Sequence, residues 1–441
     1  HNIIDDHSTL TIDNGIGAKI YNVKEIKTQQ APMPFITEQT GTFGIASNST
    51  SKEIRGLDVE EYSWSIIHAK HNITSTINTT NLGLLVDAGV LIQIQNDAKI
   101  QNDWYLNLNG KIDLQGRSQL VQTIDSDLAP TSAGSIEKDQ QGTTNKFNYN
   151  YWSSPVGPIN AATNNNNYSV NTVFKDGTNP AALVNINWIG GYDSTPGTPI
   201  NICRYWIYKF QNVSNSYANW TQIFETGLLG PGQGFTLKGS SGAGSIQNYT
   251  FIGKPFNGTI SSPIAANNLN LSGNPYASAI DASAFIIDNA SSTTGTLHFW
   301  EHYPSNNTHI LAGYQGGYAT RNLVGGIPPI APALISGLGS STRIPGRFIP
   351  VGQAFFVKGS ASGGNIEFKN SQRIFVKEDD LNSNVMFRNE TITNPNDSYQ
   401  EDQYEKIRLG FTTATNLHRQ VLLGFMNDKA TNGLDYGYDS I

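Results

Sequence analysis

The stretch LGLLVDAGVLIQIQNDAKIQNDWYLNLNGKIDLQGRSQL, residues 82–120, decides the fold because its apolar residues keep to even positions. Successive side chains of a strand point to opposite faces, so this alternation predicts one buried face. The phase survives breaks such as Asn96-Asp97 and Asn109-Gly110, as short strands joined by turns of even length would allow. We therefore predict a small β-solenoid or a tight meander that stacks on a neighbouring body. The buried face is predicted to hold Leu82, Leu84, Val86, Val90, Ile92, Ile94, Ile100, Trp104, Leu106, Leu108, Ile112, Leu114 and Leu120.

The composition of the 441 residues also favours β structure over helix. Charged residues make up only 14% of the chain, and Asn, Ser, Thr and Gly take their place. Asn and Gly accept turn geometry and Thr suits pleated surfaces, whereas no sustained run of helix formers occurs. The net charge of -7 comes without a basic stripe, so nucleic acid is not an expected partner. No apolar run is long enough to span a membrane, so no membrane-spanning segment is expected.

An internal duplication organises the second half of the chain. Residues 231–246 read PGQGFTLKGSSGAGSI and residues 351–366 read VGQAFFVKGSASGGNI, which align without a gap at an offset of 120. Each copy looks like a turn, a strand and a second turn, and the shared glutamine is expected to hydrogen-bond the loop backbone. We predict two related β-sandwich-like units, residues 149–260 and 264–376, packed together as one body. The repeat signature comprises Gly232, Gln233 and Phe235 in the first copy and Gly352, Gln353 and Phe355 in the second.

The whole chain is predicted to be an elongated, all-β, multi-domain protein. An aromatic strand is expected in each unit, at residues 204–208 and 297–300, whereas the proline-rich run 327–332 is expected to be loop. Two strands after residue 404 cannot form a stable domain alone, so we expect the chain to continue or these strands to pair with the body. The other predicted segments are an N-terminal β region (1–80), the solenoid or meander (81–125), a linker (126–148), an acidic linker (377–403) and the incomplete start of a further β domain (404–441).

No catalytic centre is recognisable, and the chain is predicted not to be an enzyme. The Gly-x-Ser-x-Gly pattern of a nucleophile elbow is absent. The Gly-rich stretch 230–234 runs into a strand, whereas a phosphate loop needs a helix behind it. His68 and His71 are three apart in strand-like sequence, a spacing that places them on opposite faces and does not favour a metal pair. The single cysteine, Cys203, lies in an apolar run and is expected to be a buried, inert thiol.

Calcium is the one cofactor that the sequence suggests as a candidate. Acidic loops at residues 378–380 and 435–439 offer the hard oxygen ligands that calcium prefers. Neither loop follows the spacing of an EF-hand, and a solvated loop is the simpler interpretation. We therefore predict no bound cofactor, with calcium as the alternative and no metal ligands assigned.

Several motifs agree in order with those of a known protein family. They are Tyr-Trp-Ser-Ser-Pro (151–155), Pro-Gly-Gln-Gly-Phe (231–235), Gly-Asn-Pro-Tyr (273–276), Val-Gly-Gln-Ala-Phe-Phe-Val-Lys (351–358) and the ending at residues 430–439. In this order they resemble large secreted, adhesin-like surface proteins of Bacteroidetes that the type IX secretion system exports. The resemblance covers about residues 82–441 and implies an extracellular or cell-surface location. It also implies O-glycosylation after Asp in short Asp-Ser sequences, with Ser194 and Ser440 as candidate acceptors.

Aromatic residues near Gly- or Asn-rich loops suggest what such a surface protein binds. Flat exposed rings stack on the faces of sugars, so a glycan platform is a natural hypothesis. Trp206 and Trp300 lie inside apolar strands and are expected in the core instead. The candidate glycan-binding rings are Trp188, Tyr192, Trp220, Tyr314 and Tyr318.

Three functions remain open from the sequence. The favoured hypothesis is a non-catalytic surface adhesin or surface-structure component that presents binding loops to glycans or other surface proteins. The first alternative is the carbohydrate-binding region of a larger secreted enzyme. The second is a subunit of an extracellular filament or surface layer that self-associates by strand addition.

Overall fold

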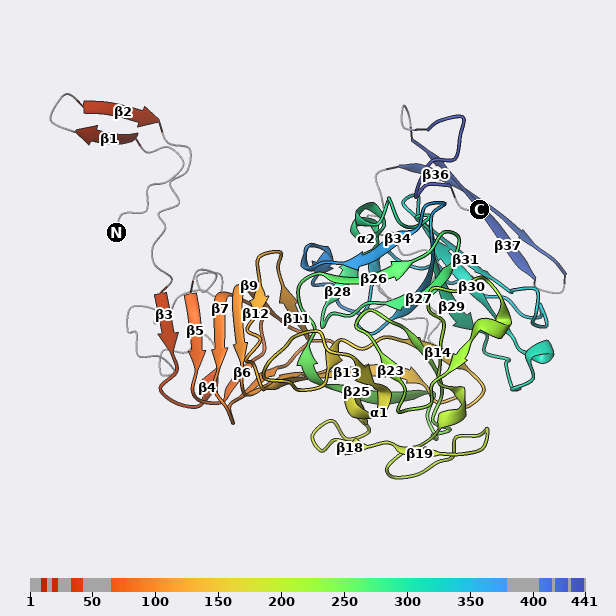
Figure 1. Ribbon diagram of the computed structural model, residues 1–441, viewed down its shortest axis with the longest axis horizontal. Helices are drawn as coiled ribbons and strands as arrows, with labels where there is room; N and C mark the ends of the chain where they lie inside the picture. Colours follow the sequence, from red (N-terminus) through yellow and green to blue (C-terminus); the bar gives the residue numbers. More distant parts are fainter. Residues whose placement is uncertain are drawn as a thin grey trace.

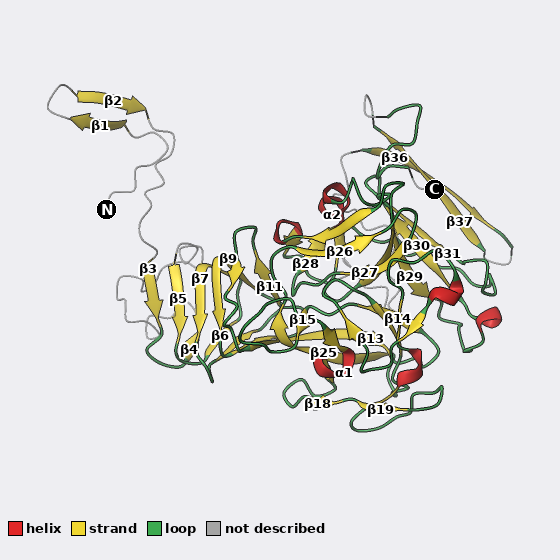
Figure 2. Ribbon diagram, viewed as in Figure 1, coloured by secondary structure: helices red, strands yellow, loops and turns green. Residues whose placement is uncertain are grey.

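The protein is elongated, with a solenoid at one end and a multi-sheet body at the other (Figure 1). A computed structural model describes residues 9–13, 18–22, 33–42, 65–378, 404–414, 417–426 and 430–439. About 45% of the residues lie in strands and 7% in helices (Figure 2), so the predicted all-β fold class is confirmed. In the part of the chain that the structure describes, no helix is long and apolar enough to cross a membrane.

Two walls of parallel strands form the solenoid, which makes about 4 turns. Equivalent apolar residues stack from turn to turn, so that Ile92 pairs with Ile112 and Leu84 pairs with Leu106. This stacking buries the predicted face, apart from the half-buried Leu82 and from Trp104. One wall contains β3 (Met33–Ile36), β5 (Ser65–Ala69), β7 (Thr79–Val86), β9 (Lys99–Leu108), β11 (Gln119–Gln122) and β12 (Asp127–Leu128). The other contains β4 (Gly41–Thr42), β6 (Ile73–Ser75), β8 (Leu91–Ile94) and β10 (Lys111–Leu114).

Trp104 points away from the face that the alternation assigns to it. Its side chain is 49% exposed, although it lies at an even position like the buried Asn102. Asn81 of β7 pairs with Asn102 of β9, but Gly83 pairs with Tyr105, so β9 has one extra residue here. Such a β-bulge disturbs the alternation of the bulged strand. The prediction that Trp104 is buried was therefore wrong.

Residues 126–148, predicted as a linker, instead join the solenoid to the body. Nearly half of this segment lies in strands, because it holds β12 and β13 (Ser135–Thr143). β13 pairs in parallel with β10 of the solenoid and antiparallel with β25 (Ile246–Pro255) of the body, so one sheet continues between them. Its polar sequence was misleading, because side chains such as Lys138 are buried with a hydrogen-bond partner, here the Gly116 carbonyl oxygen at 2.7 Å. The predicted boundary at residue 80 likewise falls inside β7.

Each repeat unit is built on four corresponding strands. β14 pairs with β24 so that Tyr149 lies opposite Lys238, and β27 pairs with β33 so that Leu269 lies opposite Lys358. These two registers match at the offset of 120, so the sequence duplication is also a structural one. The first unit uses β13, β14 (Tyr149–Trp152), β24 (Phe235–Lys238) and β25, and the second uses β26 (Ile260–Ile264), β27 (Leu269–Gly273), β33 (Ala354–Lys358) and β34 (Gly364–Phe368).

The segments inserted between these strands differ between the units. The first unit holds β15 (Val156–Gly157), β16 (Tyr168–Ser169), α1 (Val170–Val173), β17 (Phe174–Asp176), β18 (Val184–Asn185), β19 (Asn187–Ile189), β20 (Asn201–Cys203), η4 (Arg204–Trp206), β21 (Tyr208–Lys209), η5 (Tyr217–Asn219), β22 (Thr221–Gln222) and β23 (Leu228–Leu229). The second unit holds β28 (Ala279–Asp281), α2 (Ala282–Asp288), β29 (Leu297–His302), η6 (Leu311–Gly313), β30 (Gly316–Arg321), β31 (Gly326–Ile330) and β32 (Phe348–Ile349), and ends with η7 (Asn370–Gln372) and β35 (Arg373–Ile374).

Two of the predicted elements in these insertions were wrong. Residues 204–208, expected to be a strand, form the short 3-10 helix η4 and the start of β21. The proline-rich run 327–332, expected to be loop, contributes most of β31, which pairs with β30 at the edge of its sheet. An edge strand tolerates proline because the missing N–H has no neighbouring strand to serve.

The repeat signature occupies corresponding positions in the two units. The Gln233 Oε1 accepts a hydrogen bond from the Gly230 backbone N–H at 2.8 Å, and the Gln353 Nε2 donates to a backbone carbonyl at 2.8 Å. Gln233 therefore bonds the loop backbone, as predicted, whereas Gln353 bonds the backbone of Ala354, the first residue of β33. Gly232 and Gly352 both have positive φ, 75° and 68°, a conformation that favours glycine. The two signature aromatics are fully buried: Phe235 and Phe355.

The two units meet around a pseudo-two-fold axis. The Ser153 N–H donates to the Gly352 carbonyl at 2.9 Å, and the corresponding bond runs from the Gly273 N–H to the Gly232 carbonyl at 3.0 Å. Two isolated β-bridges between the units obey the same exchange. These contacts occur twice with the roles of the units swapped, as in the isologous interface of a symmetric dimer, whereas a third bridge between the units, from Val213 to Leu269, has no counterpart.

Corresponding residues of the two units face each other across this axis. They lie so close together that only one residue of each pair carries a side chain. A Cβ added to Gly273 would lie 2.4 Å from the Cβ of Ser153, its counterpart in the first unit. A Cβ added to Gly234 would lie 2.8 Å from the Cβ of Ala354, its counterpart in the second. Packed interiors do not accommodate such approaches, so at most one of the two corresponding residues can carry a side chain at each place.

A β-hairpin lies near each end of the chain. β1 (Thr9–Asp13) pairs with β2 (Ala18–Asn22) near the N-terminus. β36 (Glu405–Thr412) pairs with β37 (His418–Phe425), and this C-terminal hairpin packs against the edge strand β31 (Figure 1). Residues 379–403, most of the predicted acidic linker, lie outside the described residues.

Because a second side chain does not fit at the axis, adding a single methyl group there should destabilise the protein. Gly273→Ala should lower the free energy of unfolding by about 1–3 kcal/mol, because the new Cβ overlaps Ser153. Adding Ser153→Gly should recover part of this loss, since it removes the atom that is overlapped. Thermal unfolding measures both, with Gly190→Ala as control because nothing lies within 4 Å of a Cβ there. Equal melting temperatures for Gly273→Ala and the control would contradict the close contact at the axis.

Candidate functional site

The insertion of the first unit gathers aromatic rings on one surface. Tyr192 and Tyr217 are 59% and 56% exposed, and the rings between them are half-buried. Tyr205 packs edge to face against Tyr192 and against Trp206, each with ring centroids 4.8 Å apart. Tyr208 lies 6.3 Å from Tyr205. We call the set Tyr192, Tyr205, Trp206, Tyr208 and Tyr217 the aromatic surface.

Hydrogen bonds hold these rings in place. The Trp206 Nε1 donates to the Tyr192 carbonyl at 2.6 Å, which ties the loop after β19 to η4. The Gln222 Nε2 donates to the Tyr205 carbonyl at 2.8 Å and to the Tyr208 hydroxyl at 3.2 Å. The aromatic surface is therefore pre-formed, and a ligand would not have to order it.

A buried lysine lies beneath the aromatic surface. The Lys238 Nζ lies among three aromatic rings. It is 3.7 Å from the centre of the Trp206 ring, 4.4 Å from that of Tyr149 and 5.3 Å from that of Tyr314. The side chain is 1% exposed, and burial lowers the pKa of its amine to about 7. The facing rings oppose that effect by attracting the ammonium form. Its counterpart in the second unit, Lys358, is exposed.

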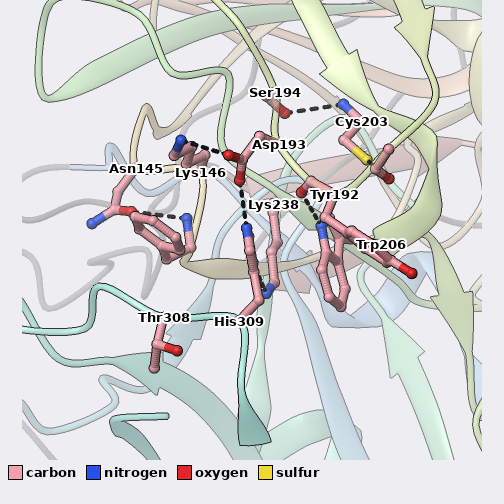
Figure 3. Close-up of polar contacts among 12 residues, drawn as sticks. Asn145, Lys146, Tyr192, Asp193, Ser194, Cys203, Trp206, Lys238, Thr308 and His309 are labelled. Atoms are coloured by element: carbon pink, nitrogen blue, oxygen red, sulfur yellow. Dashed lines mark hydrogen bonds and ion pairs between the residues drawn. The ribbon is translucent and has the colours of Figure 1, made fainter. Parts of the chain in front are cut away.

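A chain of polar groups runs from Lys238 to the protein surface (Figure 3). The Lys238 Nζ contacts the His309 Nδ1 at 2.8 Å, and the His309 Nε2 contacts the Asp193 carboxylate at 2.7 Å. The other Asp193 oxygen pairs with the Lys146 Nζ at 2.8 Å. This geometry fits a neutral His309 that donates from Nε2 to Asp193 and accepts at Nδ1 from Lys238. His309 also stacks on Trp206, with centroids 4.8 Å apart and planes 20° apart.

The charge state of this chain follows from its surroundings. Hydrogen bonds from Lys146, and then from His309, lower the pKa of Asp193 below its usual value. Burial lowers the pKa of His309, and the bond to Asp193 only partly opposes this. At the edge of the aromatic surface an anionic Asp193 therefore lies beside a cationic Lys146. The hydrogen bond between Asp193 and His309 also links a loop of the first unit to a loop of the second. The result is a set of rigid rings with Asp193 and Lys146 at its edge.

Only one of the five predicted glycan-binding rings belongs to the aromatic surface. Tyr192 does, whereas Trp188 is half-buried against the main core. Trp220 and Tyr318 pack against a second core between the units, and Tyr314, 3% exposed, lies inside it. The prediction of exposed binding rings was therefore wrong for Tyr314. Because strands of both units converge on that core, rings near loops in the sequence can still be interior.

The other four rings of the aromatic surface were not among the binding residues predicted from the sequence. The run at 204–208 looked like an apolar strand, in which alternate rings would be core. Because η4 is a 3-10 turn instead, Tyr205 and Trp206 both remain half-exposed. The prediction that Trp206 is core was wrong, whereas that for Trp300, 6% exposed, is confirmed. The clustering of Tyr and Trp between residues 192 and 220 was the signal available.

The predicted modification sites have different outcomes. Ser194 is 3% exposed, and its hydroxyl accepts a hydrogen bond from the Cys203 N–H at 3.0 Å. A sugar has no room there, so the prediction of O-glycosylation at Ser194 was wrong. Ser440 lies outside the described residues. Cys203 is buried as expected, and burial raises the pKa of its thiol.

The residues weighed as metal ligands have protein partners. His68 Nε2 contacts the Asp87 carboxylate at 2.7 Å, and His71 Nδ1 contacts the Thr37 carbonyl at 3.1 Å. In the acidic loop at 435–439, the Asp435 carboxylate accepts from Thr431 at 2.6 Å. Among the described residues, no group of three or more His, Cys, Asp or Glu is arranged to hold a metal ion.

Comparisons with known proteins give a family but no function. A family model described as Domain of unknown function (DUF8693) matches residues 61–441, a range that spans most of the solenoid, both repeat units and the C-terminal hairpin. Comparison with curated proteins and with solved structures found no match.

The burial of Lys238 predicts that stability depends on pH. Its pKa is about 7 in the folded protein and about 10.4 in an unfolded chain, so the unfolded state binds more protons between these values. The free energy of unfolding should therefore rise with pH above about 7, by about 1 kcal/mol per pH unit from this group. Lys238→Met should remove that component from calorimetric melting curves recorded between about pH 6 and 9.

The repeat supplies a control for this experiment. Lys358→Met changes the corresponding, exposed lysine of the second unit and should leave the pH profile of the wild type intact. An unchanged profile in Lys238→Met would contradict the assignment of the pH dependence to the buried amine.

Proposed function

The chain belongs to the DUF8693 family, and we propose that it is a non-catalytic, secreted surface adhesin whose aromatic surface binds glycans. The observation that carries the proposal is the exposure of Tyr192 and Tyr217 beside rings that hydrogen bonds and ring contacts hold in place. Exposed, rigid aromatic side chains offer a large contact area at low entropic cost.

The edge of the aromatic surface supports a sugar as ligand. Asp193 is 50% exposed and Lys146 is 30% exposed, so both can exchange hydrogen bonds with hydroxyl groups beside the rings. A glycan offers the matching combination, because its ring faces are apolar and its rim carries hydroxyls. Lys238 and His309 serve this surface indirectly by holding Trp206 and Asp193 in position.

The scaffold supports the cellular part of the proposal. A rigid solenoid joined to a duplicated body positions the insertion of the first unit as a surface feature, and binding functions commonly sit on such insertions. The resemblance to exported adhesin-like proteins of Bacteroidetes motivates the proposed cell-surface location and export by the type IX secretion system. A carbohydrate-binding region of a larger secreted enzyme would use the same surface.

Glycan-array binding tests the proposal. Tyr192→Ala and Tyr217→Ala should each weaken binding by about tenfold, roughly 1.4 kcal/mol, because each removes a stacking face. Trp104→Ala is the matched control, since Trp104 is a similarly exposed ring on the solenoid, and it should bind as the wild type does. An array without any binding, or equal losses in all three variants, would contradict the proposal.

A further inference from the structure

The C-terminal hairpin carries its apolar side chains away from the body. β36 and β37 pair so that Ile407 lies opposite Leu423 and Leu409 opposite Val421, all on one face. Strand alternation gives the other face to polar or small residues and Leu422. The apolar face is exposed along its whole length, by 45–66% for each side chain. We call this set the hairpin face: Ile407, Leu409, Phe411, Val421, Leu423 and Phe425.

Contacts on the inner side fix this orientation. The Arg408 Nη1 donates to the Gly326 carbonyl of β31 at 2.7 Å. Gly424 approaches Val324 so closely that a Cβ there would lie 2.6 Å from the valine Cγ1. The hairpin cannot turn its apolar side inward without breaking both contacts. The fold therefore presents the hairpin face to solvent. Figure 1 shows the hairpin of β36 and β37 lying at the side of the body.

The size of the hairpin face suits a weak, specific interface. Six half-exposed apolar side chains present roughly 500 Å² of apolar surface, since full burial of one such side chain removes on the order of 100 Å². Apolar patches of this extent on a protein surface mark interaction sites. Two such faces together bury about 1,000 Å², which is the lower limit for a specific interface.

The charges at its two ends make the hairpin face complementary to itself. Glu405 lies at one end, paired with Phe425, and Arg419 lies at the other end and on the other strand, paired with Phe411. If two copies stack with their strands antiparallel, the Glu405 end of each meets the Arg419 end of the other. A parallel stack would bring like charges together, which is unfavourable.

We propose that the hairpin face docks a second copy of this chain, with the two hairpins stacked face to face and their strands antiparallel. The result is a two-layer β-sandwich at the centre of a symmetric dimer, in which each copy covers the apolar side chains of the other. The dimer would carry two aromatic surfaces, one for each copy. This pairing is independent of whether those surfaces bind glycans.

Sedimentation velocity of the full chain tests the pairing. Between about 1 and 100 μM the wild type should shift from monomer to dimer, the range expected for a small interface. Leu409→Asn and Leu423→Asn should each raise the dissociation constant by at least about tenfold. Leu338→Asn makes the same substitution at an equally exposed site outside the hairpin and should leave it unchanged. Unchanged melting temperatures would show that the hairpin variants still fold.

A charge exchange tests the antiparallel arrangement. Glu405→Lys should weaken the dimer, and the double change Glu405→Lys with Arg419→Glu should restore it, because the two residues lie at opposite ends of one hairpin and meet only between copies. A wild type that stays monomeric throughout overturns the proposal and leaves the hairpin face to a different protein. Association that survives Leu409→Asn overturns it in favour of another surface, and a double variant as weak as Glu405→Lys alone overturns the antiparallel stack.

Discussion

The contact between the two repeat units at their pseudo-two-fold axis is the constraint on which the rest of the body depends. Two symmetry-related backbone hydrogen bonds, Ser153 to Gly352 and Gly273 to Gly232, hold the units close together at the axis. At that distance at most one of two corresponding residues can carry a side chain. Duplicated β units can therefore pack this closely only where at least one of the two facing residues is glycine.

The candidate binding surface inherits its rigidity from this pairing. Trp206 and Lys238 come from the first unit, whereas Tyr314 and His309, which contact them, come from the second. Buried polar groups are stable only when they are satisfied, so the Lys238–His309–Asp193 chain exists only while the units are docked. An insertion that belongs to one unit is thus braced by the other, and loosening the axis would also loosen the aromatic surface.

The solenoid is attached with equal firmness. Besides the shared strand β13, Arg373 of the second unit reaches across to donate to the Leu120 carbonyl of β11 at 2.8 Å, while its guanidinium lies over the Tyr276 ring at 4.7 Å. These contacts bring the last strand of the body to the last turns of the solenoid. The solenoid and both units therefore form one continuous core rather than independent domains.

The buried face of residues 82–120 and the frames of the two repeat units were determined by the sequence alone, because the side chains of a strand alternate with a period of two and the duplication repeats its own turn residues. The choice between a solenoid and a meander was left to the tertiary structure. Tertiary structure decided the rest, where burial depends on partners distant in the chain. Trp104 points outward because β9 has a bulge where it pairs with β7. The polar strand β13 is central because β10 and β25 pair with it on either side. The rings of the aromatic surface are likewise held by η4, Gln222 and His309. The sequence pattern of residues 204–208 could not predict those contacts, because Gln222 and His309 lie outside this run.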